Sequence, residues 1–131
     1  MKDIKDILLQ SKTVAIVGLS SNPEKASRKV AEFLIENGFT VVGVNPAIGK
    51  AGNIDVYPSL LEIPFPIDIV DVFRKSEDIP SIIPDVLKIN PTVLWLQLGI
   101  RNDKVLEEVQ KKGIFTIQDK CIKIETLKYL F

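Results

Sequence analysis

The segment VAIVGLSSNPEKASRKVAEFL, residues 14–34, determines our prediction of the fold. It starts with apolar, mostly β-branched residues that end at Gly18, continues with a polar turn, and then shows the apolar spacing of an amphipathic helix. In α/β proteins, a buried strand, a glycine turn and a helix in this order often bind phosphate, because the helix N-terminus faces the anion. The segment therefore predicts an α/β domain with a phosphate-binding loop.

Four other apolar segments repeat the pattern of this first strand. The five predicted strands are residues 13–19, 40–44, 67–73, 92–98 and 114–118. Their continuous hydrophobicity indicates strands buried on both faces, as in a parallel sheet, and helical patterns lie between them. We therefore predict an α/β fold with a doubly wound sheet of five parallel strands, in the order 3-2-1-4-5, and with helices on both faces.

Helix ends are marked by residues that favour caps. Gly38 follows the first long helical segment, where a C-terminal glycine is expected, and Gly113 follows a later one. Ser76 and Asn102 are predicted N-caps of the helices that follow them, although Pro80 and its neighbours indicate an irregular start for the helix after Ser76.

Composition limits the classes of function. The 131 residues predict one domain, residues 1–131, and the 17 basic and 17 acidic residues give a formal net charge of zero. A chain without net positive charge has no global field to attract nucleic acid or a membrane. A single cysteine allows no internal disulfide, and we find no signal peptide or membrane span in the sequence. We therefore expect a soluble, cytoplasmic protein.

The absence of histidine restricts the chemistry further. Without it, Ser-His and Cys-His catalysis and the usual zinc sites are excluded. Carboxylates and lysines remain available for catalysis. We therefore expect no metal site and no catalytic residues, and a binding protein is favoured over an enzyme.

The loop after the first strand carries the predicted binding groups. Gly18 allows a close approach of the backbone, Ser20 and Ser27 offer hydroxyl groups, and Lys25 and Arg28 add positive charge. The loop is longer and poorer in glycine than the dinucleotide-binding fingerprint. An alternative of similar weight is that the serines merely cap the following helix.

The end of the second predicted strand distinguishes between nucleotides. An NAD site usually has a carboxylate there, which binds the ribose hydroxyl groups. This strand instead ends in Asn45 and Pro46, so NAD is disfavoured. Lys50 follows shortly afterwards and leaves NADP or another phosphorylated ribose open.

Six segments taken together resemble a known family. They are VAIVGLSSNPEKAS, VVGVNP, VYPSLLEIP, DIVDVFRKSE, LWLQLGIRN and DKCIKIE, spread over residues 13–125. They resemble the stand-alone CoA-binding proteins, which are similar to the N-terminal CoA-binding domain of the succinyl-CoA synthetase alpha subunit. The resemblance implies a Rossmann-like fold that binds coenzyme A through its nucleotide end.

The resemblance also implies a set of site residues. It places Gly18, Ser20, Lys25 and Ser27 at the phosphates, Asn45 and Pro46 at the second wall, Val72, Phe73 and Arg74 at the adenine and its ribose phosphate, and Gln97 and Gly99 near the pantetheine. Leu19, next to Gly18, joins the candidate set. Arg28 is a candidate because of its charge: it either strengthens phosphate binding or points to water. Three positions depart from the family pattern. Ala26 replaces a common proline, Arg28 a common aromatic residue, and Thr126 a histidine after an acidic residue.

Several other residues have two interpretations. Phe73 is either a core residue or a ligand wall, and Trp95 is predicted to be core. Asp68 and Asp71 lie in the third predicted strand, and one of them is expected to orient a loop by accepting backbone N–H groups, with paired acid–base catalysis as the weaker alternative. Gln97 is interpreted as functional, because an amide buried at a strand end needs hydrogen-bond partners. Cys121 is either a structural thiol or a contact for the thiol of CoA.

The sequence thus predicts a protein that binds CoA or an acyl-CoA through its nucleotide and pyrophosphate portion, without catalysis. Its expected partner is the small molecule, and a protein partner or a homo-oligomer remains open. Two alternatives are an NADP-binding oxidoreductase-like domain and a regulatory or structural module with a vestigial nucleotide pocket.

Overall fold

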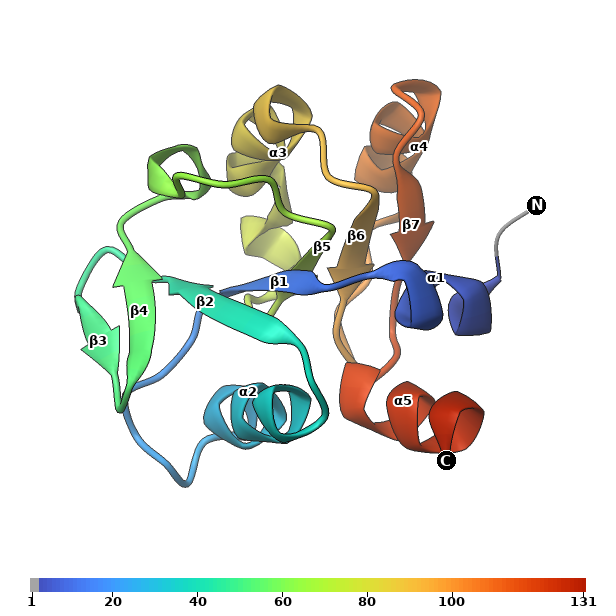
Figure 1. Ribbon diagram of the computed structural model, residues 1–131. Helices are drawn as coiled ribbons and strands as arrows, with labels where there is room; N and C mark the ends of the chain where they lie inside the picture. Colours follow the sequence, from blue (N-terminus) through green and yellow to red (C-terminus); the bar gives the residue numbers. More distant parts are fainter. Residues whose placement is uncertain (1–2) are drawn as a thin grey trace.

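The computed structural model describes residues 3–131, which form a central sheet between two layers of helices (Figure 1). The strands are β1 (Thr13–Val17), β2 (Thr40–Val44), β3 (Lys50–Ala51), β4 (Ile54–Tyr57), β5 (Ile69–Val72), β6 (Val93–Leu96) and β7 (Phe115–Ile117). The α-helices are α1 (Ile4–Gln10), α2 (Ala26–Glu36), α3 (Ile79–Ile89), α4 (Asp103–Lys111) and α5 (Ile122–Leu130), and short 3-10 helices are η1 (Leu60–Glu62) and η2 (Ser76–Asp78).

The predicted number of strands is wrong. The sheet has seven strands in the order β3-β4-β2-β1-β5-β6-β7, and the sequence analysis missed β3 and β4. β4 has four residues, and the exposed side chain of Asp55 interrupts its apolar pattern because β4 is only partly covered. The two-residue β3 pairs with it in the antiparallel direction.

The predicted strand order is also corrected. Residues 67–73 were placed at the edge beyond the second strand, but β5 pairs directly with β1, on the other side from β2. The edge position beyond β2 belongs to β4. The six parallel strands therefore have the order 3-2-1-4-5-6, which is that of doubly wound nucleotide-binding sheets.

Both faces of the sheet are covered by helices, as predicted. α1, α2 and α5 pack on the face that carries Ile16 and Trp95, whereas α3 and α4 pack on the face of Val17 and Leu96 (Figure 1). These four strand side chains are almost completely buried. Burial on both faces explains why the central strands are continuously apolar.

The caps confirm some predicted helix ends and correct one. Asn102 caps α4, since its Oδ1 accepts the N–H of Val105 at 3.1 Å, and Gly38 follows α2 with a φ of +94°. Ser76 does not cap α3. Its Oγ accepts the N–H of Arg101 at 3.0 Å, and α3 begins later, next to Pro80. A proline suits this first turn because it lacks the N–H that would have no partner there.

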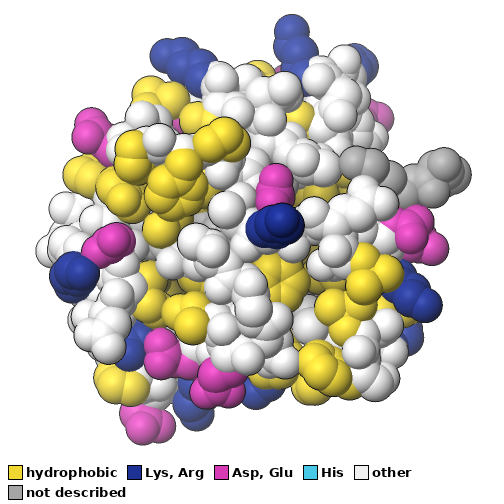
Figure 2. All heavy atoms as spheres, viewed as in Figure 1, with side chains coloured by type: hydrophobic (Ala, Val, Ile, Leu, Met, Phe, Trp, Pro, Cys, Tyr) yellow, Lys and Arg dark blue, Asp and Glu magenta, His cyan; other side chains and the backbone are white. Residues whose placement is uncertain are grey.

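The surface shows no single-sign field in the view of Figure 2, where positive and negative side chains are interspersed. Hydrophobic atoms gather over the segment between β4 and β5 and over α5, where Leu61 and Phe131 are 49% and 75% exposed. Within residues 3–131, no helix is long and apolar enough to cross a membrane.

Candidate functional site

The ends of β1, β2 and β5 meet at the Gly18 turn. The N–H of Gly18 donates to the carbonyl of Val44 at 2.9 Å, and Gly18 has a φ of +91°. A Cβ atom at this position would lie 2.6 Å from the carbonyl oxygen of Phe73. A glycine is therefore required for both the backbone conformation and the close approach of the neighbouring strand.

The loop between β1 and α2 is held by its own hydroxyl groups. The N–H of Ser20 donates to Oγ of Ser27 at 3.0 Å, and Oγ of Ser20 accepts the N–H of Asn22 at 3.0 Å. Ser27 is buried, whereas Lys25, just before α2, is exposed. The two hydroxyl oxygens thus shape the loop, and their O–H groups remain as donors for a ligand.

Arg28 does not point to solvent. Its side chain is 7% exposed, Nη1 donates to the carbonyl of Ser21 at 2.6 Å, and Nε is buried without a partner. A Cβ on Gly52, in the β3–β4 turn, would lie 2.9 Å from Nη2. No carboxylate of residues 3–131 forms an ion pair with Arg28. A buried cation without a counter-ion is costly, so its surroundings favour an anion.

The residues that follow β2 in the chain form the second wall beside the loop. Nδ2 of Asn45 donates to the carbonyl of Leu19 at 3.0 Å, and its Oδ1 accepts the N–H of Ala47 at 2.9 Å. The Leu19 side chain is fully buried, so Leu19 can contribute only its backbone to a site. Lys50 forms an ion pair with Asp55 at 2.6 Å, which lessens its availability for a ribose phosphate.

A groove of about 510 Å³ opens between the starts of α2 and α5. It brings together four predicted site residues from three different segments, namely Phe73, Arg74, Gln97 and Cys121. Ala26 and Val30 of α2 and Leu98, Ile100 and Ile124 supply most of the remaining, largely apolar wall. An apolar groove with few polar groups, beside the loop before α2, can hold a long and mostly apolar ligand.

The remaining predicted residues lie outside this groove. Pro46 and Arg74 line a smaller hollow of about 130 Å³ on the α3 side, so Arg74 borders both hollows. The side chain of Val72 is fully buried in the core, and the structure therefore limits Val72 to a backbone role. Gly99 is exposed, and its N–H donates to Oδ1 of Asp119 at 2.7 Å. This hydrogen bond holds the pKa of Asp119 below its usual value.

Sequence analysis missed the pairing of Asp71 with Gln97. Nε2 of Gln97 donates to Oδ1 of Asp71 at 2.5 Å, and both side chains are buried. Burial raises the pKa of Asp71 to about 7, while the hydrogen bond from Gln97 acts in the opposite direction. The available signal was two polar residues near the ends of apolar strands that prove to be neighbours.

The other ambiguous residues are now placed. Asp68 orients a loop, as one aspartate was expected to do, since Oδ2 accepts the N–H groups of Lys12 and Thr13 at 2.7 and 3.1 Å. Trp95 is fully buried, as predicted, and its Nε1 donates to the carbonyl of Lys120 at 2.8 Å. Phe73 is half-buried, and it both packs against the core and lines the groove.

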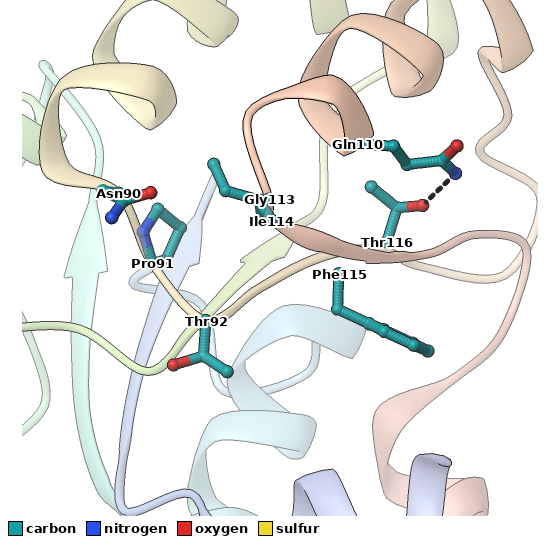
Figure 3. A pocket seen from close by; sticks show the side chains of 8 residues that line it. All are labelled: Asn90, Pro91, Thr92, Gln110, Gly113, Ile114, Phe115 and Thr116. Atoms are coloured by element: carbon teal, nitrogen blue, oxygen red, sulfur yellow. Dashed lines mark hydrogen bonds between the residues drawn. The ribbon is translucent and has the colours of Figure 1, made fainter. Parts of the chain in front are cut away.

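Another hollow, of about 700 Å³, lies at the end of the sheet where β6 and β7 begin (Figure 3). It is lined by Asn90, Pro91, Thr92, Gln110, Gly113, Ile114, Phe115 and Thr116. These residues are near the amino ends of β6 and β7, and none of them is charged. Because ligands of doubly wound sheets bind at the carboxyl ends of the strands, we place the candidate site at the groove between α2 and α5.

A family model described as a CoA binding domain matches residues 12–126. The chain belongs to this family of CoA-binding domains. The match includes all the segments that form the Gly18 turn, the loop before α2 and the groove.

Relatives include both stand-alone proteins and parts of larger enzymes. The chain is 39% identical to the uncharacterised protein YneT of Bacillus subtilis (strain 168) over 122 residues, which are 93% of this chain and 90% of that protein. A solved structure from Thermus thermophilus is 32% identical, with a TM-score of 0.92 and 96% of both chains covered. An ADP-forming acetate–CoA ligase of Archaeoglobus fulgidus is 29% identical over 63% of this chain, which is only 12% of the ligase.

Proposed function

We propose that this protein binds CoA or an acyl-CoA through its nucleotide and pyrophosphate portion. The observation that carries the proposal is that the loop before α2, with buried Arg28, and the apolar groove lie together at the carboxyl ends of the strands in a domain of the CoA-binding family. CoA has the matching chemistry, since its charged phosphates join a nucleotide to a long pantetheine arm.

The charges around the loop support the placement of the phosphates. The N-terminus of α2 carries a partial positive charge, and Lys25 is exposed at this end of the helix. Arg28 adds a buried cation, and Arg74 lies between the two hollows, although Asp78 approaches it at 3.6 Å. The phosphates would therefore lie beside the loop, with the arm in the groove.

We further propose that the domain does no chemistry by itself. The chain contains no histidine, and no groups of three potential metal ligands occur within residues 3–131. Asp71 has a pKa suitable for proton transfer, but it is fully buried behind Gln97 and lacks direct access to a ligand. The geometry therefore favours binding over catalysis.

The experiment is isothermal titration with CoA, acetyl-CoA, NAD and NADP. We expect CoA to bind. Lys25→Ala should weaken binding by roughly tenfold, because a charge-assisted contact is lost, and Phe73→Ala should weaken it because apolar contact area in the groove is lost. Lys29→Ala is the matched control, because Lys29 is exposed on the same helix and faces Glu24 at 3.9 Å. Preferential binding of NADP would favour the oxidoreductase-like alternative, and no binding would favour the vestigial pocket.

Cys121 offers a second, chemical readout of the same site. It is a half-buried thiol in the groove, and we propose that it lies near the thiol of bound CoA. Its thiolate would attack CoA disulfide, form one new S–S bond and release the other CoA as a thiolate. We expect mass spectrometry to show a single CoA adduct, formed faster than the adduct with glutathione disulfide and absent from Cys121→Ser. Equal rates with both reagents would contradict this placement.

A further inference from the structure

The proposed nucleotide binding leaves the buried pair of Asp71 and Gln97 without a role. Asp71 lies between Ile16 of β1 and Trp95 of β6 in the sheet, and it is fully buried. Its Oδ2 has no hydrogen-bond partner, and its Oδ1 accepts Nε2 of Gln97. A carboxyl group in this position is costly, which makes a purely structural role a poor explanation of the pair.

Gln97 connects this pair to the candidate site. Its side chain is 3% exposed, yet it lines the groove between α2 and α5. Because Nε2 is bonded to Asp71, the amide oxygen is the atom that remains for a ligand in the groove. Most of the surrounding wall is apolar, so this oxygen is a rare hydrogen-bond acceptor there.

We propose that the amide oxygen of Gln97 accepts a hydrogen bond from an amide N–H of the pantetheine arm, and that Asp71 is a positioning residue that keeps this oxygen turned toward the groove. The inference rests on the proposed function, because it assumes that a CoA-type ligand occupies the groove. The pantetheine arm suits the site chemically, since it alternates apolar segments with amide groups.

The protonation of Asp71 determines how firmly it orients the amide. A carboxylate only accepts hydrogen bonds, so charged Asp71 requires Nε2 of Gln97 to face it. A protonated Asp71 also donates, so the amide is then free to turn its oxygen away from the groove. The relevant pKa is about 7, set by burial and by the bond from Gln97. The titratable or charged groups that other segments bring to the groove are Arg74, Lys75 and Cys121.

The first test compares CoA with 3′-phosphoadenosine 5′-diphosphate, its nucleotide part without the arm. We expect Gln97→Leu to weaken CoA by about fivefold to tenfold, the value of one hydrogen bond, and to leave the nucleotide unchanged. Gln118→Leu is the matched control, because Gln118 also donates from Nε2 to an aspartate, Asp103, at 2.5 Å but lies outside the groove.

The second test measures how the contribution of the pantetheine arm depends on pH. At pH 6 and again at pH 8, the affinity for CoA is divided by the affinity for 3′-phosphoadenosine 5′-diphosphate. We expect this ratio to be larger at pH 8 in the wild-type protein. Asp71→Asn, whose amide both donates and accepts, should show the lower ratio at both values of pH. A merely structural role for Asp71 would not produce this loss of pH dependence.

The outcomes separate this inference from the proposed function. If CoA binds but Gln97→Leu leaves it unchanged, or weakens the nucleotide equally, the inference is overturned and CoA binding stands. If the ratio for Asp71→Asn follows the wild-type ratio at both values of pH, Asp71 is not a positioning residue. If neither CoA nor the nucleotide binds to the wild-type protein, the proposed function itself fails.

Discussion

At the scale of single residues, the site depends on side chains that sequence alone left ambiguous. Arg28 is an example, because it departs from the family pattern and had no evident partner in the sequence. The structure buries its guanidinium beneath the loop before α2 and against Gly52. Because a buried cation is costly without a counter-ion, the burial of Arg28 favours an anion beside it.

Gly18 provides a stability prediction at this scale. We expect Gly18→Ala to lower the free energy of unfolding by about 1–3 kcal/mol or more, because it adds a clash with Phe73 to the strain of a positive φ. Gly38→Ala is the matched control, with a φ of +94° but nothing within 4 Å of the added Cβ. Urea unfolding measures both, and equal losses would contradict the close approach at Gly18.

The raised pKa of Asp71 makes the free energy of unfolding depend on pH. Its pKa is about 7 in the folded protein against 3.8 for an unperturbed group, so the folded state holds its proton more tightly. Its favourable contribution is complete below pH 3.8 and is lost as the pH rises through 7. We therefore expect Asp71→Asn to gain stability relative to the wild-type protein between pH 5 and pH 8, by at most about 3 kcal/mol. Urea unfolding measures both proteins at each pH. If the difference in their free energies of unfolding stays constant from pH 5 to pH 8, the raised pKa of Asp71 is contradicted.

At the scale of elements, the loop and the first turn of α2 form one unit. The hydrogen bond from Ser20 to Ser27 joins the two ends of the loop before any ligand arrives. A preformed loop reduces the entropy lost on binding, because fewer residues need to be ordered.

Two substitutions distinguish a role of the loop in binding from an effect of lower overall stability. Ser27→Ala leaves the N–H of Ser20 without a partner, whereas Asn102→Ala removes the cap of α4, which is not part of the site. We expect each to lower the free energy of unfolding by about 1 kcal/mol. CoA affinity, measured by titration, should fall in Ser27→Ala alone. An equal fall in both variants would contradict a specific role for the loop.

At the scale of the whole molecule, ligand binding should raise the free energy of unfolding and the Tm. CoA at 100 times its dissociation constant adds about 2.7 kcal/mol to the folded state, which corresponds to a rise in Tm of roughly 10 °C for a domain of this size. We expect this rise with CoA in a thermal scan and a smaller one with NADP at the same concentration. An equal rise with both ligands would contradict selection of CoA.

The alternation of strands and helices, and the position of the loop between β1 and α2, could be predicted from the sequence. Both depend on local patterns, namely continuous apolar runs, glycine turns and helix caps, which are properties of consecutive residues. Strand β4 could not be found in this way. It is short and only partly covered, so Asp55 is tolerated within it and the apolar run is broken. The predicted order placed β5 incorrectly because strand pairing is decided by packing, which local patterns do not record.

The sequence by itself determined the fold class and the family resemblance, and it pointed to the carboxyl ends of the strands, because strand ends and loop composition mark this side of a doubly wound sheet. Tertiary structure alone decided which of these side chains meet. It buried Leu19 and Val72, brought Phe73 and Cys121 to one groove, and paired Asp71 with Gln97 across adjacent strands. The physical reason is that burial and pairing depend on neighbours distant in the chain, which no local pattern specifies.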